Sequence, residues 1–560
     1  MTALSIVIVV LAACVAAVSA QGVFNDPDYH NHHCVTGTEI NHKNAGTLEQ
    51  KWTQTYAAIS LAPLGFSKDG RVVYTSDKSG GIYARDAESG ALIWQTSTRA
   101  VDGLNMTFSY TRTRPLIVRD TLIYGVNTVE GNLLTSSKTN SVIFALRASD
   151  GSFIRKSAPL DAHLASVITG TGRYHEKSDQ VIFGTSSNEE TFAYLDAYGP
   201  KCCSFRGSVS ALNAQTLAVN WKTYMTGTQP GALPGTYLTP GAAVWTSDIP
   251  IDEEENAVYV ATGNNYEVAP ELVECLKDVT ETCTSTNVSC IASGNSACYA
   301  AYDPKDNFAE SAVALDLTTG RVKWSTKLTE EQGWTLACYR GAGVNTCPAA
   351  PGKDSDFGEA PILSTVNGRK VATLLQKSGF AYLLDRKTGA LIRAQSLTPG
   401  GPAGGFQWGS AYRGGKIYAL GTNSLFAPSV MTNGQTIRYG SYLAFDAATG
   451  ALDYQLPEPT LVVHPKVPGG TNYTFSRPMS QTVVTNDLFG FTSNSGWAYL
   501  VNRHTGAPLW QADVNGSSVM TGIAVRRECI YVSTGYGYLN VDTTAQPRIT
   551  AYCLPSDQEL

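Results

Sequence analysis

The sequence predicts an all-β protein folded as a β-propeller, with eight four-stranded blades as the main expectation and seven as the alternative. Three observations lead to this prediction. A turn-containing segment recurs seven times along the 560 residues. The spacing of the repeats is close to the length of one four-stranded blade. Helical periodicity is poor throughout, whereas glycine is abundant and alternating strand patterns recur.

Each repeat reads as a strand, a polar turn and a second strand that often ends in an aromatic residue. The copies are ARDAESGALIW (84–94), ALRASDGSFIR (145–155), ALNAQTLAVNW (211–221), ALDLTTGRVKW (314–324), LLDRKTGALIR (383–393), AFDAATGALDY (444–454) and LVNRHTGAPLW (500–510). The turn glycines are Gly90, Gly151, Gly320, Gly389, Gly450 and Gly506, with Leu217 in place of glycine once. Glycine tolerates the positive φ that such a turn requires. We expect the terminal tryptophans, Trp94, Trp221, Trp324 and Trp510, to pack one blade against the next.

The two ends of the chain are expected to complete the ring together. Pairing of TLEQKWTQTY (47–56) with the last strand near RITAYCL (548–554) would close an eighth blade. The step of 103 residues from Leu217 to Gly320 is the longest between turns, and its surplus matches a Cys-rich stretch at about 266–310. We expect this stretch to be a disulfide-stapled insertion on one face of a single domain spanning 21–560.

Composition and the first residues indicate a secreted protein. Residues 1–20 are apolar and end in Val18-Ser19-Ala20, which is typical of a signal peptide, with a membrane anchor as the alternative. No later run is as long, so we expect no membrane span in the mature chain. Charged residues make up only 16% and the net charge is −6, which argues against a nucleic-acid partner. Four glycosylation sequons occur, at Asn105, Asn287, Asn472 and Asn515.

The twelve cysteines also suit an oxidising compartment. We expect Cys338 to pair with Cys347 and Cys529 with Cys553. The adjacent Cys202 and Cys203 form either a vicinal disulfide or two ordinary bridges, one of them to Cys34, which is otherwise expected to be unpaired. Four more cysteines lie in the insertion: Cys275, Cys283, Cys290 and Cys298. There is no CxxCH motif, so the chain cannot hold a covalent c-type haem.

The repeat with its terminal tryptophan resembles the docking motif of pyrroloquinoline quinone (PQQ) dehydrogenases. AAVWTSDIPIDEEENAVYVATGNNY (242–266) and LLQKSGFAYLLDRKTGALI (374–392) look like quinoprotein core segments. Four strings look like the polyvinyl-alcohol-dehydrogenase-like branch: CCSFRGSV (202–209), GTSSNEE (184–190), DFGEAPIL (356–363) and GGFQWGSA (404–411). The resemblance implies PQQ over the propeller axis, a Ca²⁺ ion at the quinone, and a carboxylate base that assists hydride transfer from an alcohol.

The resemblance also implies roles for particular residues. Trp245 matches the tryptophan that stacks on PQQ, and Lys377 matches the cation that stabilises charge on the quinone oxygens. Asn264 and Glu189, with Glu190 as the fallback, match the calcium ligands.

Further residues match the binding of the cofactor itself. Arg112 matches the arginine that pairs with a PQQ carboxylate, with Arg114 close enough to take its place, and Thr169 matches a hydroxyl donor. Cys202 and Cys203 could cover the cofactor as a vicinal disulfide, although the family's pair lies one blade earlier. Trp408 and Asn423 are expected to line the same cavity.

One departure from the family concerns the base. The family carries an Asp after a Trp at the position of EEQGWTLAC (330–338), where this chain has Thr335. A threonine hydroxyl cannot act as a base near neutral pH. Glu330 and Glu331 are the nearest substitutes, at the wrong spacing.

Two functions therefore compete at the level of sequence. The first is a secreted PQQ- and calcium-dependent dehydrogenase that oxidises an alcohol, a polyol or a polymer-borne hydroxyl and passes electrons to an external acceptor. The second is a non-catalytic secreted propeller that binds a glycan, a protein or a small ligand. A zinc site built on His30, His32 and His33 is a weak third hypothesis, because these residues have no clear partners in the sequence.

Overall fold

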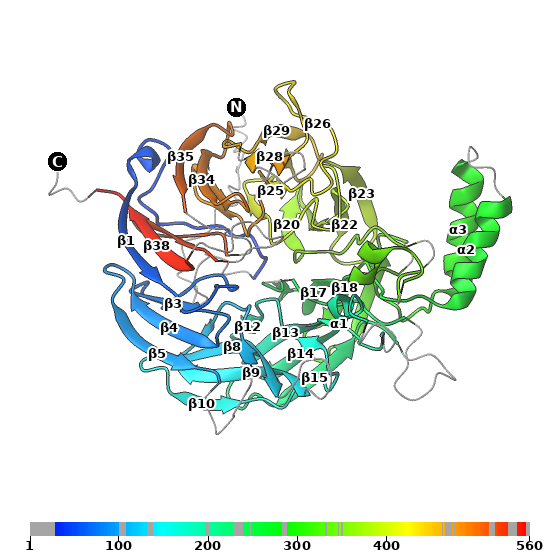
Figure 1. The fold of residues 1–560 in the computed structure, drawn as a ribbon, viewed down its shortest axis with the longest axis horizontal. Coiled ribbons are helices and arrows are strands. Elements are labelled where there is room, and N and C mark those ends of the chain that lie inside the picture. Colours follow the sequence, from blue (N-terminus) through cyan, green and yellow to red (C-terminus); the bar gives the residue numbers. More distant parts are fainter. Residues whose placement is uncertain are drawn as a thin grey trace, which may run out of the picture.

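The computed structural model describes residues 29–99, 108–130, 138–196, 202–227, 239–246, 248–282, 288–330, 333–344, 346–348, 351–461, 463–464, 473–474, 476–514, 521–535 and 546–555. Eight antiparallel sheets stand side by side around a central axis and close into a ring (Figure 1). The predicted eight-bladed β-propeller is therefore confirmed. The predicted signal peptide and all four sequons lie outside the described residues.

The blades are numbered 1 to 8 in chain order. Blade 1 comprises β2 (Gly65–Phe66), β3 (Val72–Ser76), β4 (Gly81–Asp86) and β5 (Leu92–Ser97); blade 2 comprises β6 (Phe108–Tyr110), β7 (Leu116–Val118), β8 (Thr121–Glu130), β9 (Lys138–Arg147) and β10 (Phe153–Lys156). Blade 3 comprises β11 (Ser166–Val167), β12 (Arg173–His175), β13 (Gln180–Ser187), β14 (Ser208–Asn213) and β15 (Val219–Tyr224); blade 4 comprises β16 (Ile251–Asp252), β17 (Ala257–Ala261), β18 (Ser311–Asp316) and β19 (Val322–Lys327).

Blade 5 comprises β20 (Ile362–Val366), β21 (Arg369–Leu375), β22 (Phe380–Asp385) and β23 (Leu391–Ser396); blade 6 comprises β24 (Ala411–Arg413), β25 (Lys416–Gly421), β28 (Ser441–Asp446) and β29 (Leu452–Pro457). Blade 7 comprises β32 (Val483–Val484), β33 (Leu488–Thr492), β34 (Trp497–Asn502) and β35 (Pro508–Asp513); blade 8 comprises β36 (Ile523–Arg526), β37 (Cys529–Ser533), β38 (Arg548–Cys553) and β1 (Glu49–Thr55). Two small hairpins, β26–β27 (Ser429–Val430, Thr436–Ile437) and β30–β31 (Val463–His464, Tyr473–Thr474), lie outside the blades.

Burial distinguishes the inner strands from the outer ones. The first strands of blades 4 and 7, β16 and β32, are buried along their whole length. The last strands, such as β5 and β23, leave most of their side chains exposed or half-buried. The first strands therefore line the axis, and the loops at their ends are the parts of the blades that can build a central site.

The ring is closed by the pairing that the sequence predicted. β1 pairs with β38 in antiparallel register from Glu49 opposite Cys553 to Thr55 opposite Arg548. An N-terminal strand thus becomes the outer strand of the C-terminal blade and joins the two ends of the chain in one sheet.

The repeat tryptophans dock each blade onto the next. The indole N–H of Trp94 donates to the carbonyl of Ala148 at 3.0 Å, three residues before Gly151. A Cβ at Gly151 would lie 2.4 Å from the Trp94 ring, so only glycine leaves room for this contact. Trp221 and Trp324 make the same two contacts with the blade that follows each of them. The structural role predicted for these tryptophans is therefore confirmed.

Other residues take over the docking contact where tryptophan is absent. Arg393 donates to the carbonyls of Ala447 and Ala448, and the Tyr454 hydroxyl donates to the carbonyl of Arg503 at 3.2 Å. Leu217, which replaces the turn glycine once, has a positive φ of 58° and is buried. Packing thus preserves the turn even without the preferred residue.

The Cys-rich insertion contains two helices that the strand-rich sequence analysis did not predict. α2 (Pro270–Thr282) and α3 (Val288–Tyr302) form a hairpin that projects from the ring beside blade 4 (Figure 1). Leu272 and Leu276 lie one turn apart on α2 and pack with Tyr299 of α3. The disulfide Cys275–Cys298 links the two helices. The spacing of Leu272 and Leu276, one helical turn apart, was the local signal for a helix in this segment.

Three further disulfides lie among the described residues. Cys202–Cys203 is a vicinal disulfide, and Cys338–Cys347 and Cys529–Cys553 are bonded as predicted. Cys34 is also disulfide-bonded. The expectation that Cys34 is unpaired or pairs with Cys202 or Cys203 is therefore wrong.

The N-terminal strap, residues 29–35, is tied to the inner ends of blades 4 to 7. Its carbonyl groups accept hydrogen bonds from one inner strand after another, and its His33 is buried at the axis. The assumption that His30, His32 and His33 lack partners is therefore wrong, because contacts with distant blades cannot be read from local sequence. His32 Nε2 lies 2.7 Å from the carbonyl oxygen of Leu363. This contact engages one of the two ring nitrogens with which a histidine can bind a metal.

Candidate functional site

The residues expected to bind a cofactor lie in loops at the inner ends of the blades. Lys377 follows β21, Asn264 follows β17, and Trp408 comes shortly before β24. Arg112 follows β6, and Trp245 lies in the segment between β15 and β16. Radial packing of the sheets brings these loops together although they are far apart in sequence.

Lys377 is the centre of the site. Its buried ammonium lies 3.0 and 3.1 Å from the two carboxylate oxygens of Asp354 and 3.2 Å from a carboxylate oxygen of Asp356. The same nitrogen lies 5.3 Å from the centre of the Trp245 ring, within cation–π range. A cation, two carboxylates and a broad aromatic face thus share one small volume.

A second aromatic residue and an arginine extend this surface. Trp408 meets Trp245 edge to face, with ring centres 5.5 Å apart. The Arg112 guanidinium lies 5.9 Å from the centre of the Trp408 ring. Four predicted cofactor-binding residues, Trp245, Lys377, Arg112 and Trp408, therefore form one continuous cluster. Arg114, the alternative to Arg112, instead pairs with the buried Asp248.

Two polar atoms in this cluster suggest a missing ligand. The indole N–H groups of Trp245 and Trp408 are buried, and neither has a hydrogen-bond partner among the described residues. Buried indole N–H groups usually find an acceptor, because burying one without a partner is costly. A flat ligand with several oxygen atoms would supply both acceptors and stacking surface, so these residues fit PQQ.

The vicinal disulfide belongs to the same region. Cys202 and Cys203 pack in an apolar cluster that also contains Phe205, Tyr266 and Trp245. The carboxylate of Glu189 is buried beside them and accepts hydrogen bonds from the backbone N–H groups of Ser204 and Phe205 at 2.8 to 3.1 Å.

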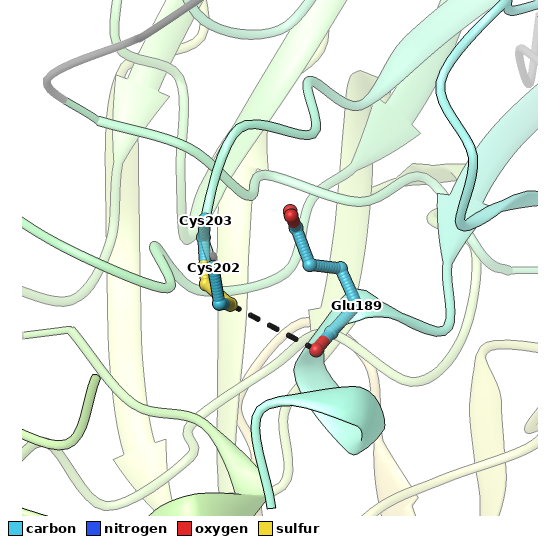
Figure 2. A group of neighbouring side chains, drawn as sticks. All are labelled: Glu189, Cys202 and Cys203. Carbon is cyan, nitrogen blue, oxygen red and sulfur yellow. Dashed lines mark hydrogen bonds between the residues drawn. A yellow bond between two sulfur atoms is a disulfide. The ribbon is translucent and has the colours of Figure 1, made fainter. Parts of the chain in front are cut away.

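Figure 2 shows Glu189, Cys202 and Cys203, the grouping of metal-type side chains that lies closest together among the described residues. The two sulfur atoms are bonded to each other, so they offer no thiolate to a metal. The Cys202 sulfur lies 3.9 Å from the Glu189 carbonyl oxygen, a contact without a proton to share. Within this grouping the Glu189 carboxylate is the group that could still serve as a hard ligand.

Glu190, the fallback ligand, is electrostatically coupled to the Lys377 cluster. Burial and repulsion from Asp356 raise the pKa of Glu190 to about 7, with Lys377 opposing the shift. Burial, together with Asp356 and Glu190, likewise raises the pKa of Asp354 well above its usual range, against the pull of Lys377. Three carboxylates thus face one ammonium group, which leaves an excess of two negative charges when all are ionised.

Asn264 holds this region together. Its side-chain nitrogen donates to the carbonyl oxygens of Asn265 and Trp334, each at 2.7 Å. Its backbone N–H donates to Asp356 Oδ1 at 2.6 Å. The amide is therefore held in one orientation beside Asp356, with its side-chain oxygen as a hard ligand for a cation.

Three predicted site residues make mainly internal contacts. Thr169 donates from its hydroxyl to the Trp245 carbonyl at 3.4 Å and so supports the stacking residue. Asn423 exchanges side-chain hydrogen bonds with the backbone of Ala427, which braces its own loop. Thr335 is fully buried, and its hydroxyl lies 3.2 Å from that of Thr346.

Asp354 was not singled out from the sequence, and Asp356 appeared only as part of a matching string. Thr335 precedes the short helix η4 (Leu336–Arg340) and the loop closed by Cys338–Cys347, and the chain returns to the axis only at Asp354. The pair of aspartates two residues apart, in KDSDFG (353–358), was the available signal. The intervening disulfide loop obscured it.

Comparison with known proteins gives one matching family model and several similar proteins. The family model PQQ_2, described as "Outer membrane protein assembly factor BamB", matches residues 40–336. The polyvinylalcohol dehydrogenase of Sphingopyxis sp. (strain 113P3) is 28% identical over 387 residues, covering 66% of this chain and 50% of the relative. The quinohemoprotein alcohol dehydrogenase of Pseudomonas putida is 23% identical over 383 residues, covering 64% and 43%. This chain therefore spans about half the length of these relatives.

Solved structures support the fold. Quinohemoprotein alcohol dehydrogenase from Comamonas testosteroni superimposes with a TM-score of 0.65 at 17% identity, covering 96% of this chain and 81% of that one. A europium-containing methanol dehydrogenase gives a TM-score of 0.62 at 17% identity, with 96% and 98% covered.

The fold is the propeller seen in these solved structures. The match over more than half of its length shows that this chain belongs to the PQQ_2 family. It is similar to a polyvinylalcohol dehydrogenase and to a quinohemoprotein alcohol dehydrogenase. In the described part of the chain, no helix is both long and apolar enough to cross a bilayer.

Proposed function

We propose that this protein is a secreted dehydrogenase that uses PQQ and Ca²⁺ to oxidise an alcohol or polyol and passes the electrons to an external acceptor. The observation that carries the proposal is the contact of Lys377 with Asp354, Asp356 and the Trp245 ring in one buried cluster. Bound PQQ would supply a quinone able to accept a hydride.

In this proposal Asp354 is the general base. Its carboxylate is buried against Lys377, and its pKa is raised by burial and by Asp356 and Glu190. A raised pKa brings a carboxylate closer to the pKa that an effective general base needs near neutral pH. Lys377 would hold the carboxylate in place and stabilise negative charge that develops on a bound quinone. Thr335 then needs no catalytic role.

Other residues would hold the cofactor and the ion. Trp245 and the Cys202–Cys203 disulfide offer flat apolar surfaces, and Arg112 offers a charge partner for a PQQ carboxylate. Glu190 and Asn264 offer oxygen ligands, and the local excess of negative charge suits a divalent cation. Glu189 would support the disulfide through Ser204 and Phe205.

The surroundings favour an alcohol larger than one carbon. A groove of about 610 Å³ opens beside the cluster, and its wall includes Ser355, next to Asp354, and Ser378, next to Lys377. Trp334, Phe380 and Tyr382 give the groove an aromatic lining. Such a groove would bind the non-reacting part of an alcohol or polymer segment.

The disulfides support an oxidising, extracytoplasmic location. The alternative of a non-catalytic binding propeller depended mainly on Thr335 at the expected position of the base. Asp354 removes that argument, so the enzyme is the preferred proposal.

Titration with PQQ in the presence of Ca²⁺ tests the proposal. We expect quenching of tryptophan fluorescence, a higher melting temperature, and dye-linked oxidation of an alcohol by the loaded protein. Asp354→Asn should keep PQQ binding but lose about a hundredfold or more of the turnover, because the base is removed. Lys377→Ala should weaken PQQ binding.

A wild-type protein that shows no binding at saturating PQQ would refute the proposal. Binding without turnover in both wild-type and Asp354→Asn proteins would instead favour a sensor. Glu88→Gln, an exposed change far from the axis, serves as the control and should behave like the wild type in every assay.

A further inference from the structure

We infer that the N-terminal strap, residues 29–35, positions the two tryptophans of the cofactor site, with His33 as the residue that transmits its position. The inference rests on the proposed function, because the tryptophans matter as PQQ-binding residues. His33 is a positioning residue, and the ligand class that it serves is a planar quinone.

The strap crosses the inner ends of four successive blades. Backbone N–H groups of Ile251 in blade 4 and Leu363 in blade 5 donate to the carbonyls of Tyr29 and His30, at 3.1 and 3.0 Å. Tyr412 in blade 6 donates to His32 at 2.9 Å.

Val484 in blade 7 completes the series. It donates to the His33 carbonyl at 3.1 Å and accepts from the N–H of Val35 at 2.8 Å. The strap is therefore a belt across half of the ring, and its position depends on the relative placement of blades 4 to 7.

The His33 side chain enters a buried polar cluster at the axis. Its Nε2 lies 3.2 Å from the side-chain nitrogen of Gln481 and 3.6 Å from Asp248 Oδ2. Asp248 also accepts from Gln481 at 2.9 Å and from Arg114. His33 and Asp248 are each only 2% exposed, so little solvent can replace a lost partner.

Asp248, which faces His33, and Arg114, which pairs with Asp248, each lie close in sequence to a residue of the proposed cofactor site. Asp248 is three residues after Trp245, and Arg114 is two residues after Arg112. The buried cluster therefore holds the far side of the loops that present Trp245 and Arg112.

His33 reaches the loop of Trp408 through Gly409. A Cβ at Gly409 would lie 2.7 Å from His33 Cε1, so the imidazole packs directly against the residue after Trp408. Trp408 itself has a φ of 83°, a conformation that a bulky side chain adopts only under constraint. Gly409 is held from the other side by Thr482, which donates its N–H to the Gly409 carbonyl at 2.9 Å.

Trp408 in turn contacts Trp245 edge to face at 5.5 Å. A shift of the strap would therefore reach both rings through Gly409 and through Asp248. Because binding of a rigid planar ligand depends on a pre-formed site, loss of His33 should weaken affinity more than it weakens the fold.

The test compares His33→Ala, His33→Gln and a control, Trp94→Phe, in the full-length protein. PQQ affinity is measured by fluorescence titration with Ca²⁺ present, and stability by urea denaturation. We expect His33→Ala to bind PQQ about tenfold more weakly or worse, and His33→Gln, which keeps a polar side chain opposite Gln481, to recover much of the affinity. Trp94→Phe removes a docking hydrogen bond far from the axis and should lower stability without changing affinity.

A second readout needs no cofactor. In the apo-protein, His33→Ala should raise acrylamide quenching of tryptophan fluorescence, and this increase should disappear in a Trp245→Phe/Trp408→Phe background. Wild-type affinity together with wild-type quenching in His33→Ala would overturn the inference. Failure of the wild-type protein to bind PQQ would refute the proposed function, and the quenching result alone would then decide whether the strap positions the indoles.

Discussion

Buried carboxylates carry most of the chemistry of this propeller at the scale of single residues. Asp354 and Asp356 share Lys377, whereas Asp248 is paired with Arg114 at the axis. Burial by itself raises the pKa of Asp248, but Arg114 and His33 reverse the effect and hold it far below its usual range. The balance of neighbouring charges therefore decides which buried carboxyl group stays ionised and which has its pKa raised toward neutral pH.

Glu458 gives a prediction that is independent of the cofactor. Burial raises its pKa from 4.5 to about 7, although Ser495 and Tyr499 donate to it. The folded state thus binds a proton more tightly than the unfolded state, so stability falls as the pH rises between about 4.5 and about 7. Glu458→Gln should remove this loss, worth up to about 3 kcal/mol.

Urea denaturation at about pH 5 and about pH 8 measures the effect of this change. The variant should lose less stability than the wild type between the two values, and exposed Glu88→Gln should match the wild type. An unchanged pH dependence in Glu458→Gln would show that the carboxyl is ionised in the folded protein.

The blade is the repeating element, and its stability depends on the contact of a side chain with the next turn. Trp324 packs over Gly389 and donates to the carbonyl of Arg386 at 3.2 Å. Arg393 and Tyr454 make equivalent backbone hydrogen bonds in other blades. The element therefore requires a long side chain with a donor at its end, and tryptophan is one solution among several.

Two glycine-to-alanine substitutions in blade 5 test whether blade docking depends on this contact. Gly389→Ala puts a Cβ 2.4 Å from the Trp324 ring at a φ of +73°, whereas Gly368→Ala has a φ of +76° and open space around it. Both should lose about 1–2 kcal/mol from the left-handed conformation. Gly389→Ala should lose about 1–3 kcal/mol more from the clash. Equal losses in denaturation experiments would exclude a docking role for Gly389.

Closure of the ring is decided at the scale of the whole molecule. Blade 8 combines β1 with β36 to β38, and the Cys529–Cys553 disulfide joins β37 to β38, the strand on which β1 pairs. The strap adds a second connection from the N-terminal region, across blades 4 to 7. Both connections join segments that are far apart in sequence.

Removal of Cys529–Cys553 should therefore destabilise the entire propeller. We expect Cys529→Ala/Cys553→Ala to lose about 2–4 kcal/mol in a single cooperative transition, because the closing blade holds the ring. Cys338→Ala/Cys347→Ala, which opens a nine-residue link beside the site, should lose less. A larger loss in this second variant than in the first would contradict a closing role for blade 8.

The sequence by itself determined the all-β class, the blade repeat, the docking tryptophans and the strand that closes the ring. These features follow from local turn chemistry and from a period that is visible along the chain. It also identified Trp245, Lys377, Arg112 and Trp408, which the structure brings together.

Tertiary structure alone decided which acids face Lys377, where the strap lies and that Cys34 is disulfide-bonded. Asp354 and Asp356 reach Lys377 only because a disulfide loop returns to the axis, and His33 meets Asp248 across more than two hundred residues. Local sequence patterns do not predict these long-range contacts, because the radial packing of eight sheets determines which loops converge.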